Sequence, residues 1–160
     1  MILNQWRYAI LLGVFIILTA RADFDGRVVR ILDGDTIETL SASGQSVRIR
    51  LAGIDAPEKN QPFGQRSRQA LSALLAQKAV QITGDKNDQY GRLLGTVWME
   101  GTDVNALQVK NGMAWAYRYH GRAINPQYEQ LENMAKGNSI GLWSVPGQTE
   151  PWRWRQASKE

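Results

Sequence analysis

The chain has 160 residues, with 19 Lys+Arg against 15 Asp+Glu and a hydrophobic fraction of 43%, which is ordinary for one compact globular domain. It contains no cysteine and one histidine. This composition excludes disulfides, thiolate metal sites, cysteine nucleophiles and any chemistry that needs two imidazoles. The catalytic groups that remain are mainly carboxylates, arginines, lysines and tyrosines.

The first 22 residues have the pattern of a secretory signal peptide. Arg7 precedes the apolar run "YAILLGVFIILTA", and "ARA" follows, so we expect cleavage after Ala22. The run is shorter than the roughly 20 apolar residues that span a bilayer, and a retained membrane anchor is the alternative. Either way we expect the body to be secreted or periplasmic. Without Arg7 and Arg21, 17 basic residues face 15 acidic ones, so the mature charge is about +2.

Strands dominate the first half of the remaining chain, and helices the second. Extended or alternating runs predict strands over 27–40 (two runs around a D-G turn), 46–54, 79–83, 93–100 and 113–120. Apolar stripes and caps predict helices over 65–78, 102–112 and 125–138, with Thr102 or Asp103 and Asn125 as caps. Because strands and helices do not alternate, we expect a small closed or nearly closed antiparallel barrel with appended helices.

Three short polar motifs stand out: "DGD" at 33–35, "RLAGIDAPE" at 50–58 and "DQYGR" at 88–92. The first two bring carboxylates to the ends of neighbouring extended segments, and carboxylate oxygens suit hard divalent cations. The arginines match phosphate oxygens in a bidentate manner. A further carboxylate could prepare a water for attack on phosphorus. The motifs together predict a site that holds a phosphodiester and a cation.

Each motif also has a purely structural interpretation. "DGD" can be a simple turn, and arginines on the polar face of a strand are usually solvated. His120, at a strand end, is expected to be a surface or loop residue. Aromatic residues can form the wall or core of the barrel, and those of the tail can pack on the body or touch nucleic acid; they are Trp98, Trp115, Tyr117, Tyr119, Trp152 and Trp154.

In chain order, "ILDGDTI", "RIRLAGIDAPE", "PFGQRSRQAL", "DQYGRLLGTVW", "VNALQVKNGMAWAYRY" and "GLW" resemble the staphylococcal (micrococcal) nuclease family, over residues 27–144. As in the family pattern, the arginine at 50 lies five residues before an aspartate and eight before a glutamate. The resemblance implies a mainly β fold, a five-stranded OB-type barrel with about three appended helices. It also implies calcium-dependent cleavage of DNA and RNA that leaves 3′-phosphate ends.

The resemblance also assigns roles by position. It implies calcium ligands, two phosphate arginines, a general base and aromatics beside the nucleotide. These are, in that order, Asp35, Asp55 and the carbonyl of Ala56; Arg50 and Arg92; Glu58; and Tyr90 with Tyr117 or Tyr119.

The resulting hypothesis divides the chain into a signal peptide or anchor (1–22), a nuclease-like domain (23–145) and a C-terminal tail (146–160). It describes an endonuclease of low sequence specificity with Ca²⁺ as cofactor, DNA and RNA as substrates, and no stable membrane association once the leader is cleaved. The oligomeric state stays open, with a monomer expected. The alternative is a noncatalytic OB-type module that binds nucleic acid or protein.

Overall fold

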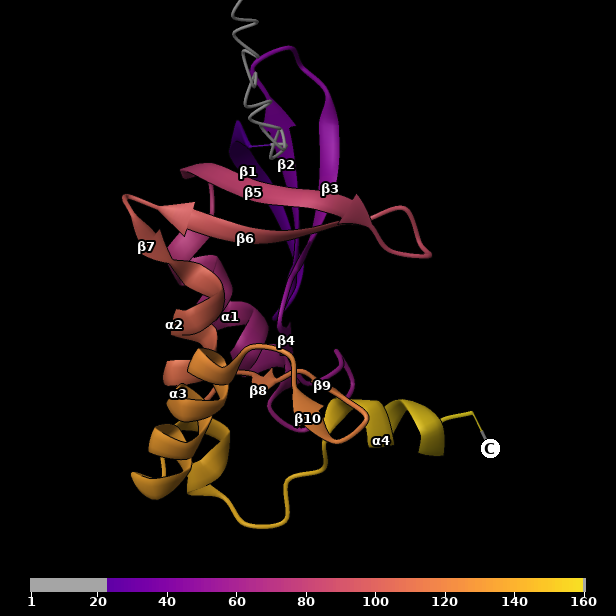
Figure 1. The fold of residues 1–160 in the computed structure, drawn as a ribbon, viewed down its shortest axis with the longest axis vertical. Coiled ribbons are helices and arrows are strands. Elements are labelled where there is room, and N and C mark those ends of the chain that lie inside the picture. The colour runs from indigo at the N-terminus through magenta and orange to yellow at the C-terminus, as the bar shows by residue number, and fades with distance from the viewer. Residues whose placement is uncertain (1–22, 160) are drawn as a thin grey trace, which may run out of the picture.

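Five strands close into a barrel at the centre of the protein (Figure 1). The structure, a computed structural model, describes residues 23–159, so the predicted leader lies outside the described residues. The barrel strands are β1 (Phe24–Asp33), β2 (Thr36–Ser41), β3 (Ser46–Leu51), β5 (Ala79–Asn87) and β6 (Leu93–Met99). Antiparallel pairs follow the order β3-β2-β1-β5-β6, and β3 pairs with β6 in parallel to complete the circle. The expected five-stranded OB-type barrel is confirmed, although its closing pair is parallel.

The alternation within the strands decides which face of the barrel wall is buried. In β3, Ile49 and Leu51 are fully buried in the barrel core, and Arg48 and Arg50 lie on the opposite face. Val28 of β1 and Ile37 of β2 enter the same core. Successive side chains of a strand point to opposite faces. Because Ile49 and Leu51 point into the core, Arg50 between them points to the outer face of the barrel.

Most of the helices lie on one side of the barrel, below it in Figure 1. They are α1 (Gly64–Leu75), α2 (Val104–Lys110), α3 (Pro126–Gly137) and the 3₁₀ helix η1 (Gly141–Ser144); the last helix is α4 (Pro151–Ala157). The predicted caps are present: Asp103 accepts the N–H of Ala106 at 2.9 Å, and Asn125 accepts that of Gln127 at 3.0 Å. Both caps satisfy amides that have no partner within their helix.

The prediction of one strand over 113–120 is wrong. The segment forms two short strands, β8 (Trp115–Ala116) and β9 (Arg118–Tyr119), which pair with β4 (Ile54–Asp55) and β10 (Arg122–Ala123). Between them Tyr117 donates its N–H to the carbonyl of Gly53 at 2.9 Å. The chain exchanges one pairing strand for another at Tyr117, and an alternation of apolar and polar residues does not reveal such an exchange. Two remaining short strands, β7 (Thr102–Asp103) and β10, complete the fold.

The proline- and glycine-broken tail contains a helix. α4 lies apart from the other helices, beneath the loops that follow β3 and beside the β9–β10 hairpin (Figure 1). Pro151 stands in its first turn and is buried. No helix within residues 23–159 is both long enough and apolar enough to cross a membrane.

Candidate active site

The turn between β1 and β2 positions the first two carboxylates. Oδ1 of Asp33 accepts the N–H of Asp35 at 3.0 Å and closes a tight turn around Gly34. A Cβ at Gly34 would lie 1.8 Å from Oγ of Ser67 in α1, so the turn packs directly on this helix. The Gly34 carbonyl also accepts a 2.8 Å hydrogen bond from Gln108 of α2. Asp35 is therefore held at the rim of the barrel by two helices.

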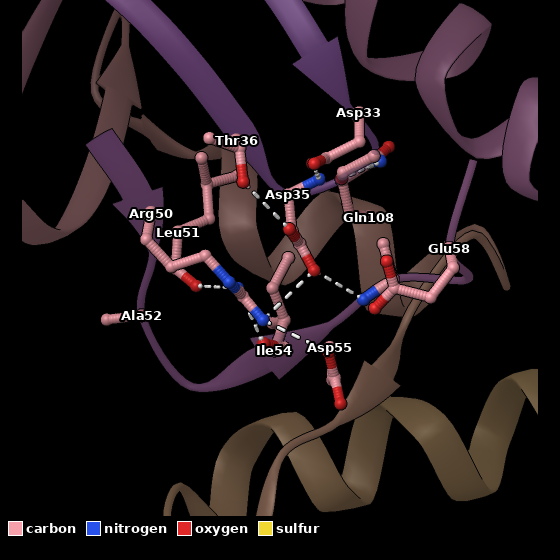
Figure 2. A network of polar contacts seen from close by, with 12 residues as sticks. Asp33, Asp35, Thr36, Arg50, Leu51, Ala52, Ile54, Asp55, Glu58 and Gln108 are labelled. Carbon is pink, nitrogen blue, oxygen red and sulfur yellow. Dashed lines mark hydrogen bonds and ion pairs between the residues drawn. The ribbon is translucent and has the colours of Figure 1, made fainter. Parts of the chain in front are cut away.

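Arg50 is fixed by its own loop before it meets a carboxylate. Its Nη1 donates to the carbonyls of Leu51 at 2.9 Å and Ile54 at 3.0 Å. Its Nη2 lies 3.1 Å from Oδ2 of Asp35 and 3.1 Å from Oδ1 of Asp55. Figure 2 shows the guanidinium between the two aspartates. With 13% of its side chain exposed, Arg50 is oriented in advance and has little freedom to move.

Both aspartates are buried. The side chain of Asp35 is 8% exposed and that of Asp55 is 1% exposed. Oδ2 of Asp35 accepts the N–H of Ala56 at 2.6 Å, and Oδ1 accepts the hydroxyl of Thr36 at 3.1 Å (Figure 2). Asp55 comes from β4, which pairs with β8 through Trp115. Two loops that are distant in the sequence thus share one hydrogen-bonded cluster.

Glu58 lies on the more open side of this cluster, with 37% of its side chain exposed. Its N–H donates to Oε1 of Gln61 at 3.0 Å, which orders the loop after β4. At Gly64, where α1 begins, a Cβ would lie 1.9 Å from the carbonyl of Glu58. The start of α1 therefore packs against this residue and fixes its backbone.

A second guanidinium reaches the cluster from α4, where the sequence motifs gave no signal of a site residue. Nη1 of Arg155 lies 2.7 Å from Oε1 of Glu58 and 3.1 Å from Oδ1 of Asp55, and Nη2 lies 2.8 Å from Oδ2 of Asp55. These hydrogen bonds to Asp55 are the main reason that the pKa of Arg155 is raised above its usual value. The tail thus contributes a residue to a site that its sequence did not indicate.

Carboxylates outnumber guanidiniums in this cluster. Burial, followed by the negative charge of Asp35, raises the pKa of Asp33 to about 7. Burial also raises the pKa of Asp55, against the hydrogen bonds from Arg155 that lower it. Low solvation penalises the charged form of an acid unless enough positive charge lies nearby. For both carboxyls burial therefore outweighs the nearby positive charge, and the neutral form is favoured more than in a solvated acid.

The oxygen donors of the cluster fit a hard divalent cation. Asp35 and Asp55 present buried carboxylate oxygens to one pocket, and hard cations prefer oxygen ligands. Among the described residues, no group of three or more histidine, cysteine, aspartate or glutamate side chains is arranged to hold a metal. A cation here would complete its shell with backbone carbonyls and water, as hard cations do. The carbonyl of Ala56, beside Asp55, remains the predicted backbone ligand.

Arg92 lies at the other end of the same pocket, in the loop between β5 and β6. It does not join the Arg50 cluster, because its Nη2 and Nε donate to Oδ2 of Asp88 at 2.7 and 2.8 Å. Burial would raise the pKa of Asp88, but these hydrogen bonds lower it. The ring of Tyr90 lies 5.3 Å from the guanidinium and is 74% exposed. The structure thus places the second predicted phosphate arginine at the pocket but turns it toward its own loop.

One pocket of about 870 Å³ connects these regions. Tyr90 and the half-buried Tyr117 line it together with Ile124. Tyr119 is not among its lining residues; it is 64% exposed and its ring contacts that of His120 at 4.1 Å between centroids. Of the two alternatives 117 and 119, the structure thus brings Tyr117 to the pocket. The lining residues for which no role was predicted include Asp33 and Arg155.

Comparison with known proteins agrees with this fold. Residues 48–145 match the sequence model of the family described as "Staphylococcal nuclease homologue". "Protein ParB" of Escherichia coli is 48% identical, over 95% of this chain and 91% of the relative. "Micrococcal nuclease" of Shigella flexneri is 49% identical, over 88% of this chain and 85% of the relative. An "Uncharacterized endonuclease" of Haemophilus influenzae is 42% identical, over 93% and 84%.

The chain belongs to the staphylococcal nuclease family. The family resemblance expected from the motifs is confirmed, and with it an enzyme of the endonuclease class.

Proposed function

We propose that this protein is a secreted or periplasmic, calcium-dependent endonuclease that hydrolyses DNA and RNA with low sequence specificity and leaves 3′-phosphate ends. One observation carries the proposal: Arg50 is locked between the buried carboxylates of Asp35 and Asp55, with Glu58 on the open side of the same pocket. Arg50 thereby orients both carboxylates that the proposal assigns to the metal, and perturbed carboxyls that line a pocket are typical of functional sites.

In this proposal Asp35, Asp55 and the carbonyl of Ala56 hold the calcium ion. When bound, the ion supplies positive charge that offsets the charge on a phosphate oxygen. The two aspartates are suited to this task because both are buried and held in place: Asp35 accepts hydrogen bonds from Thr36 and from the N–H of Ala56, and Asp55 accepts one from Arg50. The free-energy cost of orienting these carboxylates is therefore met during folding, and no reorganisation is needed during the reaction.

The two arginines bind the phosphate and stabilise the charge that grows on its oxygens in the transition state. Arg50 is oriented in advance by the carbonyls of Leu51 and Ile54. Arg92 exchanges its bond to Asp88 for the phosphate when substrate enters. Arg50 then supplies a fixed donor, and Arg92 a donor that closes on the substrate.

Glu58 acts as the general base. It accepts a proton from a water molecule whose oxygen attacks phosphorus in line with the leaving oxygen. The new P–O bond forms as the bond from phosphorus to the 5′ oxygen breaks. The 5′ oxygen takes a proton from solvent, and the phosphate stays on the 3′ side. Hydrolysis therefore consumes one water and yields one 3′-phosphate and one 5′-hydroxyl.

Aromatic rings at the pocket account for weak sequence preference. Tyr90 and Tyr117 line the pocket and can stack on bases or sugars. Stacking tolerates any base because every base has a π face. The mature charge of about +2 gives modest long-range attraction, so binding is expected to weaken with salt less steeply than for a strongly basic protein. The predicted leader at 1–22 supports export.

A cleavage assay tests the proposal. Protein purified from cells that express the full chain is incubated with plasmid DNA and with RNA, with calcium, with a calcium chelator, and with calcium restored. We expect cleavage of both substrates, its loss in chelator and its recovery. Full cleavage in chelator would remove the metal role of Asp35 and Asp55. Binding of a labelled oligonucleotide without cleavage under any divalent ion would favour the noncatalytic module.

A further inference from the structure

The C-terminal segment is docked on the site through contacts of its own. Nε2 of Gln61 donates to the carbonyl of Thr149 at 2.6 Å, which ties the loop after Glu58 to the chain just before α4. Pro151, in the first turn of α4, is buried, and Trp154 is half-buried. The family match ends at residue 145, before α4 begins. α4 is thus an ordered addition beyond the matched region, and it presents Arg155 to the pocket.

Arg155 contacts the two carboxylates to which the proposed function gives different tasks. It binds both oxygens of Asp55, a proposed cation ligand, and Oε1 of Glu58, the proposed base. A divalent cation needs the same lone pairs on Asp55, and two positive charges at this spacing repel each other. The oxygen of Glu58 that accepts a hydrogen bond from Arg155 is also not free to accept a proton from water. Arg155 and a cation therefore cannot both hold Asp55 in this way.

Arg155 differs from Arg50 in how firmly it is held. Arg50 is 13% exposed and donates to two backbone carbonyls as well as to the aspartates. Arg155 is 41% exposed, and within residues 23–159 every hydrogen bond from its guanidinium goes to Asp55 or Glu58. A half-exposed guanidinium can regain water when it leaves, whereas Arg50 would leave buried carbonyls without partners.

We infer that Arg155 is an internal competitor of the metal ion: it occupies Asp55 and Glu58 in the metal-free protein and is displaced when a divalent cation binds. This inference rests on the proposed function, because it takes Asp55 as a cation ligand. In the metal-free state Arg155 pairs with both carboxylates and blocks the base. Cation binding releases Glu58 for catalysis, so occupation of the metal site and activation of the base become one event.

Calorimetric titration of calcium chloride, without nucleic acid, tests the inference. The variants are Arg155→Gln and, as a matched control, Arg153→Gln. Arg153 lies on the same helix, is 68% exposed, and its Nε lies 3.4 Å from Glu150, so the control removes the same charge away from the site. Protein is purified from cells that express the full chain, and circular dichroism checks the fold.

We expect Arg155→Gln to bind calcium roughly tenfold tighter or more, because charge-assisted hydrogen bonds no longer compete, while Arg153→Gln stays within about twofold of wild type. Arg155→Lys, which keeps the charge but loses the bidentate fork, should fall between wild type and Arg155→Gln, and serves if the Gln variant does not fold. Unchanged or weaker calcium binding in the position 155 variants overturns the inference. Weaker oligonucleotide binding with unchanged calcium affinity also overturns it and makes Arg155 a substrate contact.

The two proposals fail separately. If wild type cleaves with calcium and Arg155→Gln binds calcium no tighter, the competition is wrong and the nuclease stands. If wild type neither binds calcium nor cleaves with it, the proposed function is wrong and the competition falls with it.

Discussion

Two buried groups of charged residues in this protein have different balances. The α3 cluster consists of Glu132, Arg118 and Lys136. The carboxylate of Glu132 is fully buried; it accepts hydrogen bonds from both Arg118 Nη atoms, from Lys136 at 3.0 Å and from the N–H of Ala116 at 3.1 Å. The rim cluster consists of Asp33, Asp35, Asp55 and Glu58 with Arg50 and Arg155. Glu129 also lies 3.7 Å from Arg118, so two acids meet two cations in the first cluster, and four acids meet two cations in the second.

The pKa directions follow this balance. Burial alone would raise the pKa of Glu132, but the hydrogen bonds from Arg118 and Lys136 hold it below its usual value. In the rim cluster burial prevails, and the pKa values of Asp33 and Asp55 are raised. A cluster that neutralises itself ties α3 to β8 and β9. The rim cluster holds more acids than cations, and perturbed carboxyls that line a pocket are the pattern expected of a functional site.

The largest expected effect is the loss of turnover when an arginine that lines the pocket at a predicted phosphate position is changed. Arg50→Lys and Arg92→Lys keep the charge but lose the bidentate fork, so each should lower the turnover number by orders of magnitude while the protein stays folded. Turnover on plasmid DNA with calcium and far-ultraviolet circular dichroism are the measurements. Arg48→Lys is the matched control, because Arg48 is exposed and lies on the same strand. Equal damage from Arg48→Lys and Arg50→Lys would show that the motif is misplaced.

Glu58→Gln should affect the chemical step more than binding. A base acts in the transition state, so we expect the cleavage rate to fall by roughly 10² or more and nucleic-acid affinity to change within a few fold. Single-turnover cleavage and fluorescence anisotropy of a labelled oligonucleotide, both at saturating calcium, measure the two effects. A wild-type cleavage rate in this variant would place the base elsewhere.

Glu132→Gln should affect stability and leave the chemistry intact. The change leaves two cations without their buried partner, so we expect the free energy of unfolding to fall by roughly 1–3 kcal/mol. Urea denaturation measures this effect, and the turnover of the folded variant should match wild type. If turnover fell while stability held, the α3 cluster would belong to the functional machinery and the contrast between the clusters would fail.

The smallest expected effect is the pH dependence of that stability difference. The folded pKa of Glu132 lies below the unfolded value of about 4.3. Its contribution is therefore complete above about pH 4.3 and is lost as the pH falls through the folded pKa. The difference between wild type and Glu132→Gln should shrink between neutral pH and about pH 3, measured by urea denaturation at each pH. A difference that stays constant would exclude an ionised Glu132 as its cause.

Local sequence determined much of the fold. Alternating residues produced the barrel strands, and Asp103 and Asn125 cap their helices as predicted, because these signals act over a few residues. The same holds for part of the site: Arg50, Asp55 and Glu58 share one motif, and the loop that carries them sets their separation. The family resemblance assigned roles to Asp35 and Arg92 from their positions in the sequence alone.

Tertiary structure alone decided what depends on distant partners. The pairing of Thr36 with Arg50 brings the turn at Asp35 onto Asp55, and the parallel pairing of β3 with β6 brings Arg92 to the same pocket. Segment 113–120 divided between two partners for the same reason. Arg155 meets Asp55 across 100 residues of chain, from a tail in which the sequence predicted no site residue. Such contacts depend on burial and charge pairing between segments that are far apart in the sequence. No short stretch of sequence contains that information, because tertiary context overrides local preference.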